Sequence, residues 1–334
     1  MPIHAMAAHA AKKPLEKFQY EPAPLGPHDV EIEITHCGIC HSDLHLIDND
    51  WGMSTYPLVP GHEIIGIVKA VGPEVAHLRK GMRVGVGWQR NSCQQCEFCQ
   101  TGQENLCAKM GATCLGNYGG FATAIRTDSR FAFPIPDALS SENAAPLLCG
   151  GATTYSPFRL YEVRPSMKVG VIGIGGLGHL GLQWARAWGC EVTALSTTPE
   201  KEREAKGFGA HHFLNTRDAG MMKKAAGTFD FLLNTVFAPQ DWGALLELLR
   251  PNGKLCVVGV PSEPITIPGF PLLLGQKSVV GSVIGSRHMI AEMLAFAARH
   301  GVKAQTETFP LDKANDALAR LKANRARYRL VLTV

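Results

Sequence analysis

The first 150 residues contain short runs in which apolar and polar positions alternate. Residues 30–35 alternate apolar and charged side chains, which is typical of a half-exposed strand, and residues 64–71 and 82–86 are also strand-like. Glycine and proline separate these runs throughout. We therefore expect short strands and turns in this part of the chain.

The pattern changes near Gly150. From Lys168 onward, apolar strand-like runs alternate with amphipathic helical runs, which predicts a doubly wound parallel sheet with helices on both faces. The expected strands are residues 169–173, 192–195, 229–234 and 255–260, with 278–284 as a final strand. The expected helices are residues 177–188, 201–208 and 242–250. The remaining chain is expected to form helix 289–300, strand 304–309, helix 311–322 and strand 328–334.

Length, charge and cysteine content narrow the class of protein. The 334 residues suggest two domains, and 33 basic against 29 acidic residues argue against a nucleic-acid partner, which would need a basic face. No apolar run follows Lys12 and Lys13, so no secretory signal is expected. The charge-free stretch 169–185 is too short and too rich in glycine to span a membrane. We expect a cytoplasmic protein whose ten cysteines serve as thiols or metal ligands rather than disulfides.

A glycine fingerprint follows the apolar run 169–172 and opens a helical pattern. Gly173 permits a tight turn, Gly175 lets the backbone approach a pyrophosphate, and Gly178 allows close packing of helix on strand. The helix N-terminus attracts the negative charge of the phosphates. The alternative is a glycine-rich turn in another kind of α/β sheet. In this context the sequence predicts a dinucleotide site formed by Gly173, Ile174, Gly175, Gly176, Leu177 and Gly178.

The end of the next expected strand bears on which dinucleotide binds. An NAD site usually has an acidic residue there, which binds the ribose 2′-hydroxyl. Here Ser196 and Thr197 occupy that position, so no carboxylate repels a 2′-phosphate, and Lys201 in the following turn supplies a positive charge. Serine and threonine clusters also form turns and helix caps, and Glu200 is nearby. The pattern favours NADP(H).

Four cysteines lie within 15 residues, separated by gaps of two, two and seven residues. They are Cys93, Cys96, Cys99 and Cys107. This spacing suits one tetrahedral zinc ion that is closed to solvent and structural in purpose. An iron–sulfur cluster is the alternative, because four thiolates can also hold one.

A second set of metal-binding residue types is dispersed along the chain. Its members are Cys40, His62 and Cys149. Two thiolates and one imidazole leave the fourth position of zinc open for water or substrate, as in one known class of catalytic site. Spacing alone does not assemble these three residues, and a lone Cys149 is more often a core residue.

Taken in order, these features resemble the zinc-dependent medium-chain alcohol dehydrogenases. Cys40 is followed by His62 and Glu63, then by the four-cysteine run, Cys149 and the glycine fingerprint. Within that family the chain most resembles the cinnamyl alcohol dehydrogenase group, through residues 11–15, 149–157, 175–179 and 196–198. The resemblance covers essentially the whole chain. It implies an α/β protein with a GroES-like β-rich catalytic domain (residues 1–149 and 286–334) and a doubly wound Rossmann cofactor-binding domain (residues 150–285).

The resemblance also implies roles for residues around the dispersed set. A catalytic zinc ion would be held by Cys40, His62 and Cys149, with Glu63 as an alternate ligand or a modulator of the charge on the metal. Asp43 would orient a ligand imidazole and raise its basicity. On its own, Asp43 is equally well explained as a helix cap.

Further positions match the family's proton relay and cofactor contacts. Ser42 and His45 match the relay that moves a proton from the alcohol to solvent. His41 matches a residue that often contacts phosphate, although a surface histidine is an equal alternative. Thr153 falls in the helical segment that faces nicotinamide in the family.

Trp51 and Trp88 occupy positions that resemble the family's substrate pocket. A wall of large aromatic side chains suits planar aromatic or allylic aldehydes, whereas ordinary core packing is the alternative. The chain departs from the plant-type members here, because the region between Cys107 and Gly120 is shorter and Trp88 is bulkier than the usual residue. The sequence therefore defines the identity of the substrate less well than it defines the type of reaction.

The sequence thus predicts a zinc-dependent NADP(H) alcohol dehydrogenase or aldehyde reductase. It would hold two zinc ions per chain and transfer hydride between nicotinamide and a primary alcohol or aldehyde of aromatic or allylic type. The alternatives are a zinc-free quinone or enone reductase and a non-enzymatic NADPH-binding zinc protein. By resemblance we expect a homodimer that pairs through residues 278–284. No role is predicted for Cys37, Cys114, Cys190 and Cys256.

Overall fold

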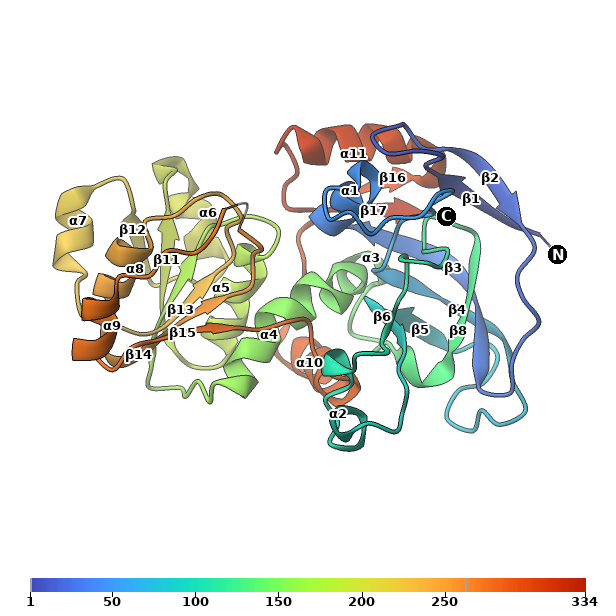
Figure 1. The fold of residues 1–334 in the computed structure, drawn as a ribbon, viewed down its shortest axis with the longest axis horizontal. Helices are drawn as coiled ribbons and strands as arrows, with labels where there is room; N and C mark the ends of the chain where they lie inside the picture. Colours follow the sequence, from blue (N-terminus) through green and yellow to red (C-terminus); the bar gives the residue numbers. More distant parts are fainter. Residues whose placement is uncertain (1, 262) are drawn as a thin grey trace. The chain divides into compact units, whose positions relative to one another are not determined.

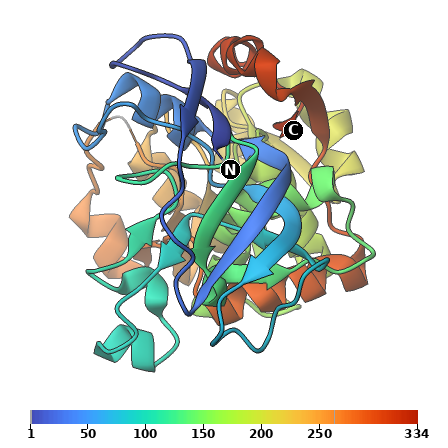
Figure 2. The ribbon, with the colours of Figure 1, turned by 90° about the vertical axis from the view of Figure 1, so that its right-hand side faces the viewer.

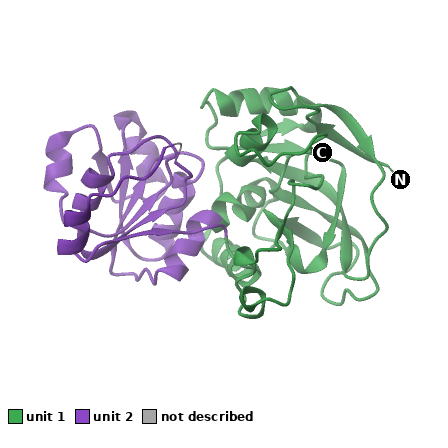
Figure 3. Cartoon of the chain, viewed as in Figure 1, with its two compact units in different colours: residues 1–152, 285–334 green, residues 153–284 purple. Residues whose placement is uncertain are grey.

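A computed structural model describes residues 2–261 and 263–334, and the chain divides into two compact units (Figures 1 and 3). The first unit comprises residues 1–152 and 285–334, and the second comprises residues 153–284. The chain therefore leaves the first unit, builds the second, and returns to complete the first.

The first unit is built around a seven-stranded mixed sheet. Its strands follow the order β16-β17-β3-β4-β5-β9, and β8 also pairs with β3. Their bounds are β3 (Asp29–Ile39), β4 (Ile64–Val71), β5 (Arg83–Val86), β8 (Ala124–Asp128), β9 (Ala132–Pro134), β16 (Thr306–Pro310) and β17 (Arg329–Thr333). Figure 2 shows the long β3 between β8 and β4, and all described pairings are antiparallel except that of β16 with β17.

Two small two-stranded sheets and several helices complete the first unit. The small sheets pair β1 (Ile3–Ala7) with β2 (Glu16–Tyr20) and β6 (Gln89–Asn91) with β7 (Gly111–Ala112). The α-helices are α1 (His41–Asp48), α2 (Glu97–Gln100), α3 (Ser141–Ala144), α10 (Arg287–His300) and α11 (Ala314–Lys322). Short 3-10 helices are η1 (Glu104–Leu106), η2 (Ser129–Phe131), η3 (Ala145–Leu148) and η5 (Leu311–Lys313).

The core of the first unit joins segments from both ends of the chain. In β3 the apolar side chains Val30, Ile32 and Ile34 are buried while the charged positions between them are more exposed, which is the period of two expected of a strand. They pack in one apolar cluster with Leu318 of α11 and Leu330 of β17. Burial of apolar surface therefore fixes the returning segment against the strands that precede the second unit.

The second unit contains a six-stranded sheet in which all described strand pairs are parallel. The strand order is β12-β11-β10-β13-β14-β15. The bounds are β10 (Lys168–Ile172), β11 (Glu191–Ser196), β12 (His212–Asn215), β13 (Phe229–Asn234), β14 (Leu249–Val257) and β15 (Ser278–Gly281). The chain enters this sheet at its centre. Strands β11 and β12 are added on one side of β10, and β13, β14 and β15 are added on the other side. The gap between β10 and β13 is therefore the topological switch point, the place where open α/β sheets bind dinucleotides.

Helices cover both faces of the parallel sheet (Figure 1). They are α4 (Gly150–Leu160), which begins at the end of the first unit, α5 (Gly178–Ala187), α6 (Glu202–Gly207), α7 (Ala219–Lys224), α8 (Trp242–Leu248) and α9 (Gly269–Leu274), with the 3-10 turn η4 (Pro199–Lys201). Within residues 2–261 and 263–334, no helix combines the length and apolar character needed to cross a bilayer.

Some elements differ from those expected. The helix expected over residues 242–250 ends at Leu248, and β14 begins at once at Leu249 instead of residue 255. The turn-forming run Pro251-Asn252-Gly253 lies inside this strand, which shifts register against β13. Helices α1 and α7 and strand β12 were not expected. The first unit also contains an eleven-residue strand, β3, where only short strands were expected.

Candidate functional site

The first candidate site brings together three segments of the first unit. Cys40 directly precedes α1, His62 and Glu63 precede β4, and Cys149 lies between η3 and α4. Antiparallel pairing of β3 with β4 places the end of one strand beside the start of the other, which brings Cys40 to His62. One donor atom from each of the four residues lies within 4.8 Å of the others. The fold therefore gathers residues that are more than 100 positions apart in sequence.

Asp43 holds this cluster in place. Its Oδ2 accepts a hydrogen bond from the backbone N–H of Cys40 (2.8 Å), and its Oδ1 accepts one from the backbone N–H of Gly61 (2.9 Å). Oδ1 also lies 3.1 Å from Nδ1 of His62, and both side chains are fully buried. The other ring nitrogen of His62, Nε2, has no hydrogen-bond partner among the described residues. A buried ring nitrogen without a partner is free to bind a metal ion.

The charges in the cluster suit a cation. A hydrogen bond from Cys149 lowers the pKa of Cys40 well below its ordinary value, and the same contact raises the pKa of Cys149. Burial lowers the pKa of His62, but Asp43 and Cys149 together raise it by more, so the pKa of His62 is raised. Cys40 and Cys149 together with His62 offer two sulfur donors and one nitrogen donor, a set known for catalytic zinc. The residues present fit such an ion.

Glu63 forms a buried ion pair with Arg329 of β17, a residue that sequence reasoning missed. Nη2 of Arg329 donates to Oε1 of Glu63, and both side chains are almost completely buried. Burial raises the pKa of Glu63 to about 7, in opposition to the lowering effect of Arg329. Oε2 of Glu63 has no hydrogen-bond partner in the described part of the chain. A Cβ atom at Gly38 would lie 2.0 Å from this oxygen, so only glycine leaves room for the carboxylate.

Ser42 and His45 lie on α1 near the cluster. Oγ of Ser42 is 3.7 Å from Sγ of Cys40. Nδ1 of His45 is 2.8 Å from a carboxylate oxygen of Asp50. This contact orients the imidazole and leaves Nε2 as the nitrogen that can exchange a proton. No sequence signal pointed to Asp50, which lies in the turn after α1.

A half-buried tryptophan packs beside each of the two histidines. The ring of Trp51 lies 5.1 Å from that of His45, and the ring of Trp88 lies 4.9 Å from that of His62 at an interplanar angle of 86°. The structure therefore places both aromatic residues next to the candidate site. Both tryptophans also pack against the apolar core of the first unit, so these contacts fit core packing as well as a substrate wall.

The four-cysteine run forms a separate group, here called the cysteine lobe (residues 89–112). All four sulfurs lie within 4.8 Å of one another, with 3.8 Å between Cys93 and Cys99 and 3.5 Å between Cys93 and Cys107. One tetrahedral ion with zinc–sulfur bonds of about 2.3 Å needs sulfurs about 3.8 Å apart. The spacing fits a single ion and is too small for a multi-iron cluster between the thiolates.

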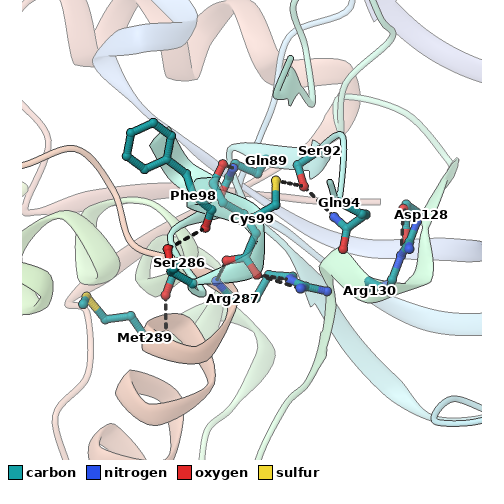
Figure 4. Close-up of polar contacts among 12 residues, drawn as sticks. Gln89, Ser92, Gln94, Phe98, Cys99, Asp128, Arg130, Ser286, Arg287 and Met289 are labelled. Atoms are coloured by element: carbon teal, nitrogen blue, oxygen red, sulfur yellow. Dashed lines mark hydrogen bonds and ion pairs between the residues drawn. The ribbon is translucent and has the colours of Figure 1, made fainter. Parts of the chain in front are cut away.

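Polar contacts hold the cysteine lobe in position (Figure 4). Oγ of Ser92 accepts hydrogen bonds from Sγ of Cys99 (3.2 Å) and from the amide of Gln94. The buried carboxylate of Glu104 forms an ion pair with Arg287. Its Oε1 accepts a hydrogen bond from Nε of Arg287 at 2.7 Å and lies 2.6 Å from Nη2 of the same guanidinium. Because Arg287 begins α10, this ion pair ties the lobe to the returning segment of the chain.

The second unit contains the glycine fingerprint between β10 and α5. Gly173 has a φ of +86°, and a Cβ atom at Gly178 would lie 1.7 Å from the carbonyl oxygen of Gly173. Both positions therefore require glycine. A Cβ atom at Gly175 would meet nothing within 4 Å, so the space beside this backbone is open. Oγ1 of Thr235, just after β13, donates to the carbonyl oxygens of Ile172 and Gly173 and fixes the turn at the switch point.

The residues that follow β11 lie near this turn. Ser196 is buried and its Oγ accepts from the backbone N–H of Thr198 (3.1 Å), while Thr197 is exposed. Nζ of Lys201 donates to the carbonyl oxygen of Ile174 (2.6 Å), which places its ammonium group at the fingerprint.

Two other residues with predicted cofactor contacts, His41 and Thr153, each lie in the first turn of a helix. His41 is exposed at the start of α1, and Thr153 is half-buried in the first turn of α4. Among the cysteines without a predicted role, Cys114 is buried with its Sγ 3.8 Å from Nδ1 of His62. Cys37, Cys190 and Cys256 are also buried, and all ten cysteines are free thiols.

Two family models match the chain. The Alcohol dehydrogenase GroES-like domain matches residues 26–137, and the Zinc-binding dehydrogenase model matches residues 176–299, which is more than half of the chain. The chain belongs to the zinc-dependent medium-chain alcohol dehydrogenases. This alcohol dehydrogenase is therefore an oxidoreductase, and the predicted GroES-like domain with a Rossmann domain is confirmed.

Relatives match this alcohol dehydrogenase over its whole length. It is 45% identical over 331 residues to aldehyde reductase AdhA of Synechocystis sp., covering 99% of this chain and 98% of that protein. The structure of cinnamyl alcohol dehydrogenase SbCAD4 from Sorghum bicolor has a TM-score of 0.96 at 40% identity, covering 100% and 98% of the two chains. A CAD from Helicobacter pylori complexed with NADP(H) has a TM-score of 0.92 at 32% identity, again covering 100% and 98%. The predicted similarity to the cinnamyl alcohol dehydrogenase group is confirmed.

Proposed function

We propose that this alcohol dehydrogenase interconverts a primary aldehyde and its alcohol with NADP(H), using a zinc ion held by Cys40, His62 and Cys149. The observation that supports this most directly is the grouping of one ring nitrogen of His62 with two sulfurs within 4.8 Å, in a residue whose buried Nε2 has no hydrogen-bond partner among the described residues. Glu63 would be an alternate ligand through its free Oε2. When bound, zinc would polarise the oxygen of the alcohol or aldehyde.

A second zinc ion in the cysteine lobe is part of the proposal. The sulfur spacing supports a closed, structural site. We also propose that the first unit is the catalytic domain and the second the cofactor-binding domain, since the metal-binding residues lie in the former and the glycine fingerprint in the latter.

Replacing Cys96 with serine should lower the zinc content from two ions per chain toward one, because serine is a poor ligand for zinc and the lobe loses one of its four thiolates. We expect the melting temperature to fall by roughly 5–10 °C. Metal analysis and thermal unfolding provide the measurements. Cys190→Ser, at a buried cysteine of the second unit, is the control and should keep both zinc ions. Unchanged zinc and unchanged melting in Cys96→Ser would contradict a structural site.

Ser42 and His45 are proposed to move the proton that accompanies hydride transfer. Asp50 holds Nδ1 of His45, so Nε2 gives up or receives the proton. Asp43 acts elsewhere, because it holds the backbone of Cys40 and the ring of His62 in position for the metal.

The proposed cofactor is NADP(H). The end of β11 carries hydroxyls and no carboxylate, and the ammonium group of Lys201 lies at the glycine turn. An H. pylori relative was solved as a complex with NADP(H). Ser196, Thr197 and Lys201 are the proposed contacts of the 2′-phosphate, and the glycine turn with the start of α5 is the proposed site of the pyrophosphate.

Replacing Ser196 with aspartate should shift preference from NADP(H) toward NAD(H). Aspartate can still accept the hydrogen bond from Thr198, so the turn should survive, but its charge would repel a 2′-phosphate and bind a 2′-hydroxyl. We expect the ratio of kcat/KM for NADPH over NADH to fall by about tenfold or more. Ser196→Ala removes the hydroxyl without adding charge, and it should change this ratio much less. An unchanged ratio in Ser196→Asp would remove the argument for a 2′-phosphate site.

The proposed substrates are aromatic or allylic aldehydes and alcohols. Trp51 and Trp88 pack beside the two histidines of the candidate site and supply flat apolar walls. Relatives of this chain are named as an aldehyde reductase and a cinnamyl alcohol dehydrogenase.

The test is a panel of aromatic, allylic and straight-chain aldehydes, assayed by loss of nicotinamide absorbance with NADPH and with NADH. We expect reduction with NADPH, highest kcat/KM for aromatic or allylic members, and loss of activity after zinc is chelated. Activity toward enones that persists without zinc would instead support an enone reductase. Binding of NADPH with no turnover of any aldehyde would support a non-enzymatic role.

A homodimer is also proposed. Strand β15 lies at the edge of the parallel sheet, where an unpaired edge can join a second copy. The neighbouring helix α9 exposes Phe270, Leu273 and Leu274, each at 73–75%. Clusters of exposed large apolar side chains commonly mark interfaces. Light scattering that gives the mass of one chain would contradict the dimer.

A further inference from the structure

The first unit contains a cavity that lies apart from the candidate sites. Its lining includes none of the proposed metal ligands, relay residues or cofactor contacts. Its volume is about 470 Å³, within the range of small-molecule sites. The cavity is lined by the end of β2, by β6 and β8, and by the loops 55–57 and 116–118. It is therefore formed by several segments that the fold brings together.

One wall of this cavity is aromatic. Tyr20 and Tyr118 pack with ring centroids 4.3 Å apart, and Phe18 packs against both of them at 6.0 and 5.4 Å. This contact network keeps the two tyrosine rings in fixed positions. Neither phenol hydroxyl has a hydrogen-bond partner among the described residues. Burial raises the pKa of Tyr20 to about 12, so its hydroxyl remains a donor.

The cavity also holds a cation without an ion pair. Nη2 of Arg90 donates to the backbone carbonyl oxygen of Arg126 (2.6 Å), and no carboxylate of the described chain lies within 4.0 Å of its guanidinium. Arg126 is different, because its guanidinium is paired with Glu31 at 2.6 Å. Glu21 lines the cavity but is exposed and pairs with neither arginine. Asp29 is close enough to stabilise the charge on Arg90 through space, but it forms no ion pair with the guanidinium, whose pKa is lowered by burial.

These features together define the chemistry of a ligand. Three donors line the cavity without a direct carboxylate contact among the described residues, the guanidinium of Arg90 and the hydroxyls of Tyr20 and Tyr118, and Asp29 acts on Arg90 only through space. The fork of a guanidinium matches the two oxygens of a carboxylate, and a single cation suits a monoanion better than a phosphate dianion. The flat tyrosine rings suit an arene.

We propose that this cavity binds a planar aromatic carboxylate, with the carboxylate on Arg90 and the phenol hydroxyls and the arene against the tyrosine rings. The site is separate from the proposed catalytic residues, and its existence does not depend on the reaction proposed above.

The test uses the zinc-loaded full chain, with 2-naphthoate as the probe and 2-naphthamide as its uncharged counterpart, measured by calorimetry. We expect one naphthoate per chain and an affinity for the amide that is at least about tenfold weaker. Arg90→Gln should weaken naphthoate binding by about tenfold or more, and Tyr118→Phe by a few fold. Arg79→Gln, an exposed arginine of the same unit outside the cavity, is the matched control and should bind as the wild type does.

A carboxylate can also bind at a metal, so Cys40→Ser is included in the same series. Binding that is lost in Arg90→Gln and kept in Cys40→Ser supports the proposal. Binding that is kept in Arg90→Gln and lost in Cys40→Ser overturns it, as does equal affinity for acid and amide, or no binding up to about 5 mM. Arg90→Gln should retain aldehyde turnover, which shows that it is folded. If that variant does not fold, Tyr118→Phe and the acid–amide pair decide the question.

Discussion

Replacing Cys40 with serine should lower kcat/KM for aldehyde reduction by at least about a thousandfold. Cys40 supplies one of only two sulfurs in the candidate catalytic cluster, and its lowered pKa makes it the readier thiolate. Serine keeps the shape but not the ligand chemistry, so the polarisation of the substrate oxygen, worth several kcal/mol, would be lost. Steady-state rates with NADPH and an aromatic aldehyde, together with zinc analysis, measure the effect.

The same variant should still bind NADPH. The glycine fingerprint and the residues after β11 belong to the second unit, which contains none of the four clustered residues. Nicotinamide fluorescence should therefore give a Kd within about threefold of the wild-type value. Cys190→Ser, a buried cysteine whose Sγ contacts a backbone carbonyl, should keep full turnover. Wild-type activity in Cys40→Ser, with zinc still bound, would refute the ligand assignment.

Replacing Arg329 with methionine should lower stability by about 3–5 kcal/mol, because it leaves the carboxylate of Glu63 buried without its partner. For a unit of this size we expect the melting temperature to fall by roughly 10 °C. Protonated Glu63 needs no counter-charge, and its pKa is already raised to about 7. The deficit should therefore be largest above pH 7 and shrink as the pH falls, since the folded state of the variant takes up a proton that the unfolded state does not hold near neutrality.

The matched control is the double variant Glu63→Gln with Arg329→Met. It removes both charges, so it should recover most of the lost stability. The melting temperatures of the wild type, of Arg329→Met and of the double variant are measured at several pH values on zinc-loaded protein. A double variant as unstable as Arg329→Met alone would mean that lost packing, not an unpaired charge, explains the effect. An unchanged melting temperature in Arg329→Met would mean that the ion pair is unimportant.

Much of the second unit is predictable because its signals are local. Strand β10, the glycine turn and α5 follow one another within twenty residues, and each has its own physical requirement, such as the positive φ of Gly173. The four-cysteine run is equally local. By contrast, β12 and α7 have weakly apolar, largely exposed sequences, so no periodicity predicted them.

The first unit depends on contacts between segments that are far apart in the sequence. The spacing of residues along the chain does not predict such contacts. Cys40 and His62 meet through the pairing of β3 with β4, and Cys149 joins them from a turn after η3. Only the family resemblance selected these three together. Arg329 was missed because it is the last of three alternating arginines, after Arg325 and Arg327, and the apolar run 330–332 that follows does not show which of the three is buried. Asp50 had no signal, because an acid in a polar turn is ordinary.

The order of segments in the first unit has a consequence for biosynthesis. Glu63 and the metal-binding residues leave the ribosome before residues 153–284, whereas Arg329 follows them. At typical rates of about 5–20 residues per second, the nascent chain would wait roughly 10–35 s between residue 153 and residue 329. During that interval the second unit can fold while the incomplete first unit lacks both strand β17 and Arg329, the counter-ion of Glu63. Translation itself would therefore make the candidate metal site the last part of the molecule to be completed.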